Sequence, residues 1–178
     1  MTRVIINESS FSRSLERIAS QIIERNLDVD RLAVVGIRAR GDDLAKRLVE
    51  LIEAKTGKRP KFGYVDITLY RDDFMELTDF PLAKSSEISF DPKGMNVVLV
   101  DDVLYTGRTV RAAIDVLLDF GRPKSIQLAV LVDRGGRELP ICPDYVGKEI
   151  AVRDDEYVEV HTKETDGVDE VVLVKRSQ

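Results

Sequence analysis

The sequence has no tryptophan, one cysteine, Cys142, and one histidine, His161. A lone cysteine cannot form an internal disulfide, which favours a reducing compartment, so we expect a cytoplasmic protein. A zinc site built from cysteine and histidine side chains is excluded, because such sites need three or four of these ligands.

Long hydrophobic runs are missing as well. Uninterrupted apolar stretches such as 128–132 are as long as a strand and fall far short of the roughly 20 residues that span a bilayer. The first ten residues contain no apolar segment suited to a signal peptide. We therefore expect neither a membrane span nor export.

Charge of one sign does not dominate the chain. The 27 Lys and Arg residues and 32 Asp and Glu residues give a net charge of −5. This balance argues against a strongly basic nucleic-acid-binding protein, although a local basic face is compatible with it. Apolar residues form 43% of the 178, enough for a folded core. Since no repeat or linker divides the chain, we predict a single domain over residues 1–178.

Buried strands alternate with amphipathic helices along the sequence. Continuous apolar runs predict strands at 32–37, 96–100 and 125–132. Helical spacing of apolar residues predicts helices over 9–25, after 38–41 and after 106–109 as far as 120. We expect Ser9 or Ser10 to cap the first helix and Gly57 to follow the second. Shorter strands are expected at 3–7, 61–69, 145–147, 157–161 and 170–174, and a long polar loop at 70–92. This order predicts an α/β fold with a mainly parallel central sheet flanked by helices.

Three of the most polar segments begin where predicted strands end, at 38–41, 101–109 and 133–138. Parallel sheets bind ligands beyond the carboxyl ends of their strands, where loops lead into helices. We therefore expect one site assembled from loops that lie far apart in the sequence.

The segment 97–109, VVLVDDVLYTGRT, contains the strongest indication of a binding site. Its buried strand delivers two carboxylates, Asp101 and Asp102, and residues 106–109 then enter a helix whose first N–H groups attract phosphate. Gly107 permits close approach of an anion and a positive φ. A sugar diol or a divalent cation beside the phosphate would explain the carboxylates. Taken alone, the acidic pair is also compatible with the plain end of a strand, and Thr106 or Thr109 with a helix cap.

This string resembles the phosphoribosyl-pyrophosphate (PRPP) motif of type I phosphoribosyltransferases. Three further blocks stand in register with it: GIRARG at 36–41, DITLYRDD at 66–73 and DRGGRELPI at 133–141. Together they resemble the PyrR family, bacterial attenuation regulators of the pyrimidine operon that are also uracil phosphoribosyltransferases. The resemblance runs from about residue 11 to 174. It implies a type I phosphoribosyltransferase fold with a small hood region, and conversion of uracil and PRPP into UMP and pyrophosphate, with Mg²⁺ bound through PRPP.

The resemblance also implies a role for each block. Asp101 and Asp102 would hold the ribose hydroxyls and act as catalytic residues, together with Arg71 at the start of a loop that closes over PRPP. The residues implied in substrate binding are Arg38, Ala39, Arg40, Val100, Asp101, Asp102, Val103, Leu104, Tyr105, Thr106, Gly107, Arg108, Thr109, Arg134 and Gly135.

Within that set, Arg38 and Arg40 would grip the pyrophosphate. The Ala39–Arg40 bond matches a cis peptide that is common in this superfamily. Residues 105–109 would enclose the 5′-phosphate, and backbone groups near Arg134 and Gly135 would meet the edge of uracil. An exposed ion pair between Arg137 and Glu138 is an alternative interpretation of the adjoining residues. No residue is nominated as general base for the uracil N1 proton.

The family's second activity is UMP-dependent binding to pyr leader mRNA, which requires a basic face on a dimer. Candidate RNA-binding residues are Arg13, Arg17, Arg25, Arg137 and Lys148. The chain departs from the family pattern at several positions, among them Gly136, Cys142, Glu16 and Ser20. Two interpretations follow, an enzyme that also regulates attenuation and an enzyme without RNA binding. The family suggests a homodimer or tetramer.

Two further classes of function are weighed against this one. Purine phosphoribosyltransferases stack the base on an aromatic residue and recognise its O6 with lysine, and the tail offers only Tyr145 and Lys148 for these tasks. A non-catalytic nucleotide sensor would show a broken pyrophosphate loop, whereas Arg38 and Arg40 are both present.

Overall fold

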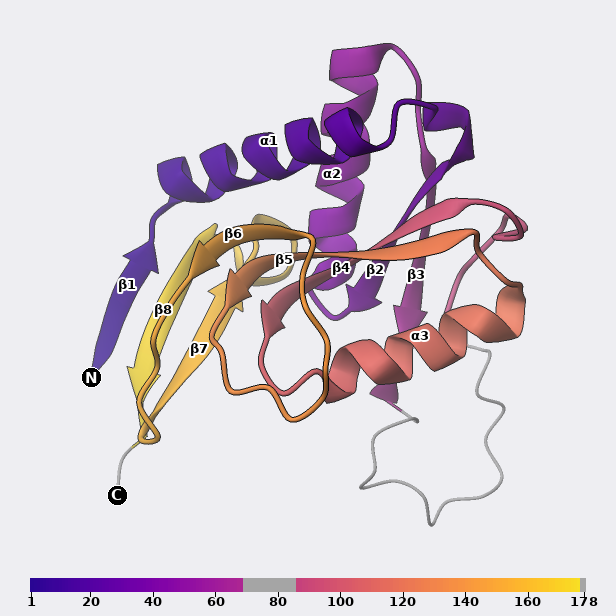
Figure 1. Cartoon of the computed structure of the whole chain (residues 1–178). Coiled ribbons are helices and arrows are strands. Elements are labelled where there is room, and N and C mark those ends of the chain that lie inside the picture. Colours follow the sequence, from indigo (N-terminus) through magenta and orange to yellow (C-terminus); the bar gives the residue numbers. More distant parts are fainter. Residues whose placement is uncertain (69–85, 177–178) are drawn as a thin grey trace.

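The chain folds into a five-stranded sheet and a smaller three-stranded sheet (Figure 1). The structure, a computed structural model, describes residues 1–68 and 86–176. Its strands are β1 (Thr2–Ile6), β2 (Leu32–Arg38), β3 (Lys61–Asp66), β4 (Asn96–Leu104), β5 (Ser125–Asp133), β6 (Tyr145–Glu149), β7 (Glu156–His161) and β8 (Glu170–Lys175). Its helices are α1 (Glu8–Arg25), α2 (Gly41–Thr56), α3 (Arg108–Phe120) and the short α4 (Lys163–Asp166), with a 3₁₀ turn at Val29–Arg31.

The five-stranded sheet has the order β3-β2-β4-β5-β6, and all its neighbouring strands are parallel. Strands β2, β4 and β5 lie in its interior, which explains their nearly continuous apolar sequences. The predicted α/β fold with a mainly parallel sheet is confirmed.

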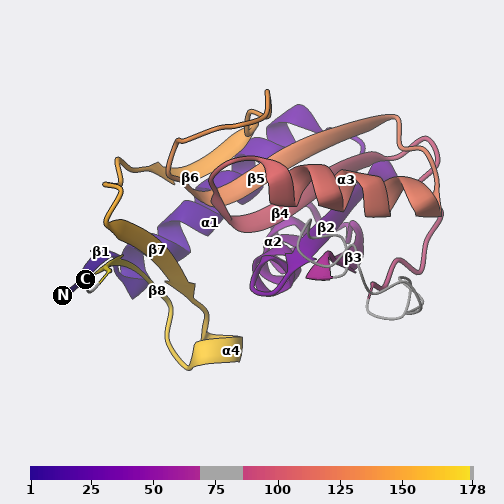
Figure 2. The same ribbon diagram turned by 90° about the horizontal axis from the view of Figure 1, so that it is seen from below.

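Helices cover both faces of this sheet (Figure 2). On one face, α1 and α2 pack against alternate strand residues such as Val34 and Val98. On the other face, α3 packs against the intervening residues, including Val35 and Leu99. Burial of each such aliphatic side chain contributes about 1.5–3 kcal/mol, so these two layers provide most of the core.

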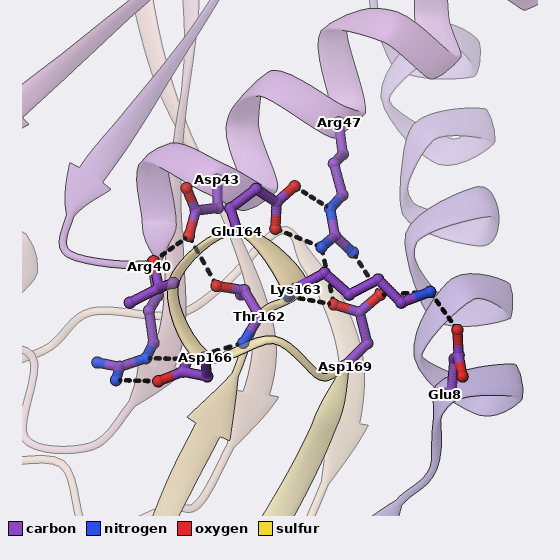
Figure 3. Close-up of polar contacts among 10 residues, drawn as sticks. Glu8, Arg40, Asp43, Arg47, Thr162, Lys163, Glu164, Asp166 and Asp169 are labelled. Atoms are coloured by element: carbon purple, nitrogen blue, oxygen red, sulfur yellow. Dashed lines mark hydrogen bonds and ion pairs between the residues drawn. The ribbon is translucent and has the colours of Figure 1, made fainter.

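The three-stranded sheet has the order β1-β8-β7 and is antiparallel throughout. It brings the first and last strands together, because β1 pairs with β8 (Figure 1). The turn between β7 and β8 contains α4 and reaches the start of α2 (Figures 2 and 3). This sheet is the small hood region implied by the resemblance.

Two helix boundaries test the predicted caps. Gly57 follows α2 in the left-handed conformation, with φ of 74°, as predicted. The predicted caps Ser9 and Ser10 are wrong, because α1 begins earlier and is capped by Asn7. The Asn7 side chain accepts the N–H of Ser10 at 3.0 Å, which places both serines inside the first turn.

Strand β4 is longer than predicted. It continues through Asp101 and Asp102 to Leu104, because its pairing with β5 extends as far as Leu104 opposite Asp133. The acidic doublet therefore lies within a strand and does not close it.

The cis peptide bond lies between Arg38 and Ala39, so its expected place at Ala39–Arg40 is wrong by one residue. Arg71 and most of the predicted loop at 70–92 lie outside the described residues. Among residues 1–68 and 86–176, no helix has the length and apolar character needed to cross a bilayer.

Candidate active site

Three polar segments meet at one edge of the five-stranded sheet. Strands β2, β4 and β5 are adjacent and parallel, so their carboxyl ends at Arg38, Leu104 and Asp133 lie on the same side. The N–H of Arg134 donates to the Leu104 carbonyl at 3.1 Å, which joins the last two segments directly. The segments 38–41, 101–109 and 133–138 thus form one candidate site.

The acidic doublet lies inside this edge. Asp101 is only 5% exposed and Asp102 is partly buried. The Asp101 carboxylate accepts the N–H of Asp102 at 2.9 Å, and the Asp102 carboxylate accepts the N–H of Val103 at 2.7 Å. In the described parts of the chain, neither carboxylate forms an ion pair within 4.0 Å.

Burial sets the acidity of both carboxyls. It raises the pKa of Asp101 well above its usual range, and the neighbouring charge of Asp102 raises it further. Burial also raises the pKa of Asp102, while hydrogen bonds and the nearby guanidinium of Arg40 act in the opposite direction. A ligand that supplies hydroxyl donors or positive charge would stabilise the ionised doublet.

The entry into α3 forms an anion-binding loop. Gly107, the residue directly before α3, has φ of 93°, a conformation that favours glycine. The Thr106 hydroxyl accepts the N–H of Arg108 at 3.2 Å, and the Thr106 carbonyl accepts the N–H groups of Glu138 and Leu139 at 2.9 and 3.1 Å. The first N–H groups of α3 have no helical acceptor and therefore suit a phosphate.

Arg137 holds the loop after β5 in place. Its guanidinium donates to Asp133 at 2.6 Å and to the carbonyls of Tyr105 and Ile141 at 2.9 Å each. Burial opposes ionisation of Asp133, but the hydrogen bonds from Arg137 and from a backbone N–H keep the pKa of Asp133 below its usual value. Arg137 thereby ties this loop to the one that precedes α3.

The alternative of an Arg137–Glu138 ion pair is wrong. Arg137 pairs with Asp133, whereas Glu138 accepts from Arg108 Nε at 2.6 Å. The Arg108–Glu138 pair joins two segments of the site, whereas the Arg137–Asp133 pair lies within the loop after β5.

An arginine–tyrosine stack borders this loop. The Arg134 guanidinium lies 3.9 Å from the centre of the Tyr105 ring. Arg134 Nε is buried without a hydrogen-bond partner in the described residues, so the ring is the main support of this cation. Gly136 has φ of 78°, and a Cβ there would lie 2.4 Å from Tyr105 Cε2. The Tyr105 ring can occupy this position only because residue 136 is a glycine.

An open pocket of about 640 Å³ lies beside the stack. One wall is formed by Asp133, Arg134 and Gly135, and the other by residues 149–152. The sequence pattern did not predict that residues 149–152 would line the site. Two tertiary contacts put them there: β6 pairs with β5, and the N–H of Ile150 donates to the Asp133 carbonyl at 2.9 Å. The lining of the pocket includes the charged residues Asp133, Arg134 and Glu149, and its volume has room for a planar base.

The loop between β2 and α2 forms the remaining side of the candidate site. The Arg38 guanidinium is about half exposed, 4.8 Å from the centre of the Tyr64 ring and 3.6 Å from the Asp42 carboxylate. Arg40 has φ of 70°, and its guanidinium donates to Asp166 of the hood (Figure 3). Sequence reasoning missed Asp166, because the four-residue helix that carries it matches no motif.

Four of the candidate RNA-binding residues lie on or beside α1 and β6. Arg17 donates to the carbonyls of Val146 and Gly147, Arg25 pairs with Asp144 at 2.6 Å, and Lys148 donates to the Ile5 carbonyl at 3.1 Å. Arg13, on α1, donates to Ser10 at 3.2 Å. The structure does not bring Arg137 to this group, since that residue supports the active-site loop.

Comparison with known proteins places this site in a family. The phosphoribosyl transferase domain family matches residues 5–164. A protein of Acetivibrio thermocellus named bifunctional protein PyrR is 53% identical over 169 residues, covering 95% of this chain and 92% of its own length. The protein of that name from Halalkalibacterium halodurans is 50% identical over 179 residues, covering 99% of each chain. This chain belongs to the PyrR family. The resemblance found in the sequence motifs is thereby confirmed.

Solved structures share the fold of this PyrR-family protein. The hypoxanthine phosphoribosyltransferase of Trypanosoma cruzi has a TM-score of 0.74 and 16% identity, covering 98% of this chain and 97% of its own. A hypoxanthine-guanine phosphoribosyltransferase of Bacillus anthracis has a TM-score of 0.70 and 20% identity, covering 97% and 96%. At these identities the likeness shows the fold alone and does not indicate the base.

Proposed function

We propose that this PyrR-family protein transfers the phosphoribosyl group of PRPP to uracil, forming UMP and pyrophosphate, and regulates pyrimidine genes by UMP-dependent binding to pyr leader mRNA. One observation carries the enzymatic half: β4 and α3 place a buried acidic doublet directly beside an anion-binding loop. The whole chain acts as a single domain, as a cytoplasmic homodimer or tetramer.

The acidic doublet holds the ribose. Carboxylates of Asp101 and Asp102 accept the ribose hydroxyls, and their negative charge stabilises the positive charge that develops at C1 in an oxocarbenium-like transition state. Catalysis in this site is therefore mainly positioning and electrostatic stabilisation. The catalytic role of Arg71 remains a prediction, since that residue lies outside the described part of the chain.

The ends of PRPP meet opposite sides of the cleft. Residues 105–109 enclose the 5′-phosphate with the first N–H groups of α3. The loop formed by Arg38, Ala39 and Arg40 binds the pyrophosphate and stabilises its growing charge as it leaves. Uracil lies in the open pocket, where backbone groups at Arg134 and Gly135 meet its polar edge.

Mg²⁺ would be held mainly through PRPP. Across residues 1–68 and 86–176, no group of three or more His, Cys, Asp or Glu side chains is arranged to hold a metal ion. The substrate phosphates and water would supply most of its ligands, and the acidic doublet beside them is compatible with a nearby divalent cation. When bound, the ion would neutralise charge on the pyrophosphate.

A radiolabelled-base assay tests the enzymatic proposal. Purified protein with PRPP and Mg²⁺ is expected to convert uracil to UMP, and to leave hypoxanthine and guanine unchanged. Turnover of a purine but not of uracil would overturn the assignment, while PRPP binding without turnover would favour a nucleotide sensor.

The regulatory half needs its own test, because four of the candidate RNA-binding cations already make contacts within the chain. A gel shift with pyr leader RNA is expected to appear at low salt, to strengthen with UMP and to weaken steeply as salt rises. Absence of a shift at low salt would leave an enzyme without an RNA-binding role.

A further inference from the structure

The turn between β7 and β8 docks on the first two turns of α2 (Figure 3). We call residues 162–169 the hood turn. Thr162 and Thr165 donate from their hydroxyls to the Asp43 carboxylate at 2.7 and 2.8 Å. Thr162 is fully buried. The hood turn is therefore packed against the helix whose N-terminus carries the proposed pyrophosphate loop.

Arg40, the residue before α2, has an unusual backbone. Its φ of 70° and ψ of −37° lie in a region that residues other than glycine rarely occupy. Such a conformation persists only where surrounding contacts hold it. The Arg40 carbonyl accepts the N–H of Leu44 at 3.1 Å, and the side chain makes the remaining strong contacts with Asp166.

The contact between Arg40 and Asp166 is bidentate. Arg40 Nε donates to Oδ2 at 3.1 Å and Nη2 donates to Oδ1 at 3.0 Å (Figure 3). Two parallel bonds of this kind define the plane of the guanidinium as well as its distance. Asp166 is itself held in place, because its Oδ2 accepts the N–H of Thr162 at 2.9 Å and its own N–H donates to the Thr162 carbonyl at 2.6 Å.

Within the part of the chain that the structure describes, the Arg40 guanidinium uses one edge for Asp166 and makes no other hydrogen bond. A guanidinium has five N–H donors, of which the bidentate contact uses one on Nε and one on Nη2. The Nη1 end points away from Asp166 in Figure 3. The positive charge of Arg40 also acts on Asp102 of the acidic doublet.

We propose that Asp166 is a positioning residue of the hood, which holds Arg40 so that its remaining donors face the pyrophosphate of PRPP. This inference rests on the proposed function, because it assigns Arg40 to PRPP. Through this contact the hood, and not only the parallel sheet, shapes the site for the donor substrate.

The hood turn offers a matched control. Glu164 accepts from Nε of Arg47 at 2.8 Å and also from its Nη2, in the same short helix as Asp166. Arg47 lies two turns further along α2, also pairs with Asp169, and makes no hydrogen bond to Arg40. Glu164→Gln therefore weakens the docking of the hood turn without touching the proposed pyrophosphate loop.

The test compares Asp166→Asn with Glu164→Gln in the full chain. We expect Asp166→Asn to raise the KM for PRPP, and its dissociation constant by calorimetry with Mg²⁺, by about tenfold, as for loss of one charged hydrogen-bonded contact. The KM for uracil should stay within about twofold of wild type, because the base lies at the far loop. Glu164→Gln should leave both KM values unchanged, and Asp166→Glu should recover part of the PRPP affinity.

A double-mutant cycle with Arg40→Lys sharpens the result. If Asp166 acts through the guanidinium, Asp166→Asn should add little to the loss already caused by Arg40→Lys. Equal changes in both KM values, or equal behaviour of Asp166→Asn and Glu164→Gln, would overturn the inference. A wild-type protein that neither binds PRPP nor forms UMP would instead overturn the proposed function itself.

Discussion

The backbone oxygen of Val100 lies 2.5 Å from the position that a Cβ on Gly41 would occupy. The first residue of α2 therefore rests directly on β4, one residue before the acidic doublet. Because backbone packs on backbone here, the end of the proposed pyrophosphate loop lies directly against the strand that carries the doublet. Only glycine allows this approach.

We expect Gly41→Ala to destabilise the protein and weaken PRPP binding. The new methyl group would clash with a carbonyl that no side-chain rotation can move, at a cost of about 1–3 kcal/mol. Denaturant unfolding and PRPP calorimetry measure the two effects. Gly57→Ala is the control, because its left-handed site has no atom within 4 Å and lies far from the loop, so it should lower stability alone. Unchanged unfolding of Gly41→Ala would contradict the observed packing.

The second prediction concerns the doublet. Asp101→Asn combined with Asp102→Asn should lower UMP formation at least about tenfold, because the amides carry no charge to stabilise the ribose cation. Thermal unfolding and circular dichroism should show that the variant still folds. Unchanged turnover would remove both carboxylates from the proposed mechanism.

The pH dependence of stability should report the burial of Asp101. Its folded pKa is raised above the unfolded value of about 3.9, so the stability that it contributes is complete at low pH and is lost as the pH rises through the folded pKa. We therefore expect Asp101→Asn to unfold at a higher temperature than wild type at pH 7, with a gap that closes toward pH 4. A gap that is independent of pH would contradict this account.

Asp166→Asn should show the opposite trend. The hydrogen bonds from Arg40 lower the pKa of Asp166, so its stabilising effect is present above the unfolded pKa and is lost as the pH falls. This variant should unfold at a lower temperature than wild type at pH 7, and the difference should shrink in acid. If the unfolding temperatures of the two aspartate variants, each relative to wild type, changed with pH in the same way, the two carboxyls would not differ in their surroundings as described.

A glycine pair tests the support of the Tyr105 ring. Gly135 and Gly136 have nearly equal φ values, 70° and 78°, so replacing either with alanine should carry a similar backbone cost of about 1 kcal/mol. Only at Gly136 would the new Cβ meet the ring, at 2.4 Å from Tyr105 Cε2, whereas nothing lies within 4 Å at Gly135. We expect Gly136→Ala to be the less stable of the two in urea unfolding.

The excess cost at Gly136 should depend on Tyr105. In a Tyr105→Ala background the clash is absent, so the two glycine substitutions should then cost the same. A difference that survives in this background would assign the cost to the backbone and not to the ring.

Much of the fold follows from local patterns in the sequence. Continuous apolar runs located β2, β4 and β5, and helical periodicity located α1, α2 and α3, because burial on one or both faces leaves a regular spacing. The acidic doublet and Gly107 were recognisable for a similar reason, since a strand end, a carboxylate pair and a helix start occupy one short segment.

The ends of the strands and helices were harder to predict from the sequence. Strand β4 runs past its acidic doublet because β5 continues to pair with it, and α1 starts at the cap supplied by Asn7 and not at either serine. The end of a helix or strand depends on which neighbouring group makes the last hydrogen bond. Several adjacent residues can often make that bond, so the sequence alone does not show which one does.

The sequence by itself determined the α/β class, the order of the main elements and the phosphate-binding motif, because each of these rests on spacing within a few residues. Only the tertiary structure decided that Asp166 holds Arg40, 126 positions away, and that Arg137 supports the active-site loop and does not join the cations of α1. Charged side chains are common along this chain, and the residues next to them in the sequence do not show which partners they contact. Their roles are set by the packing that brings distant segments into contact.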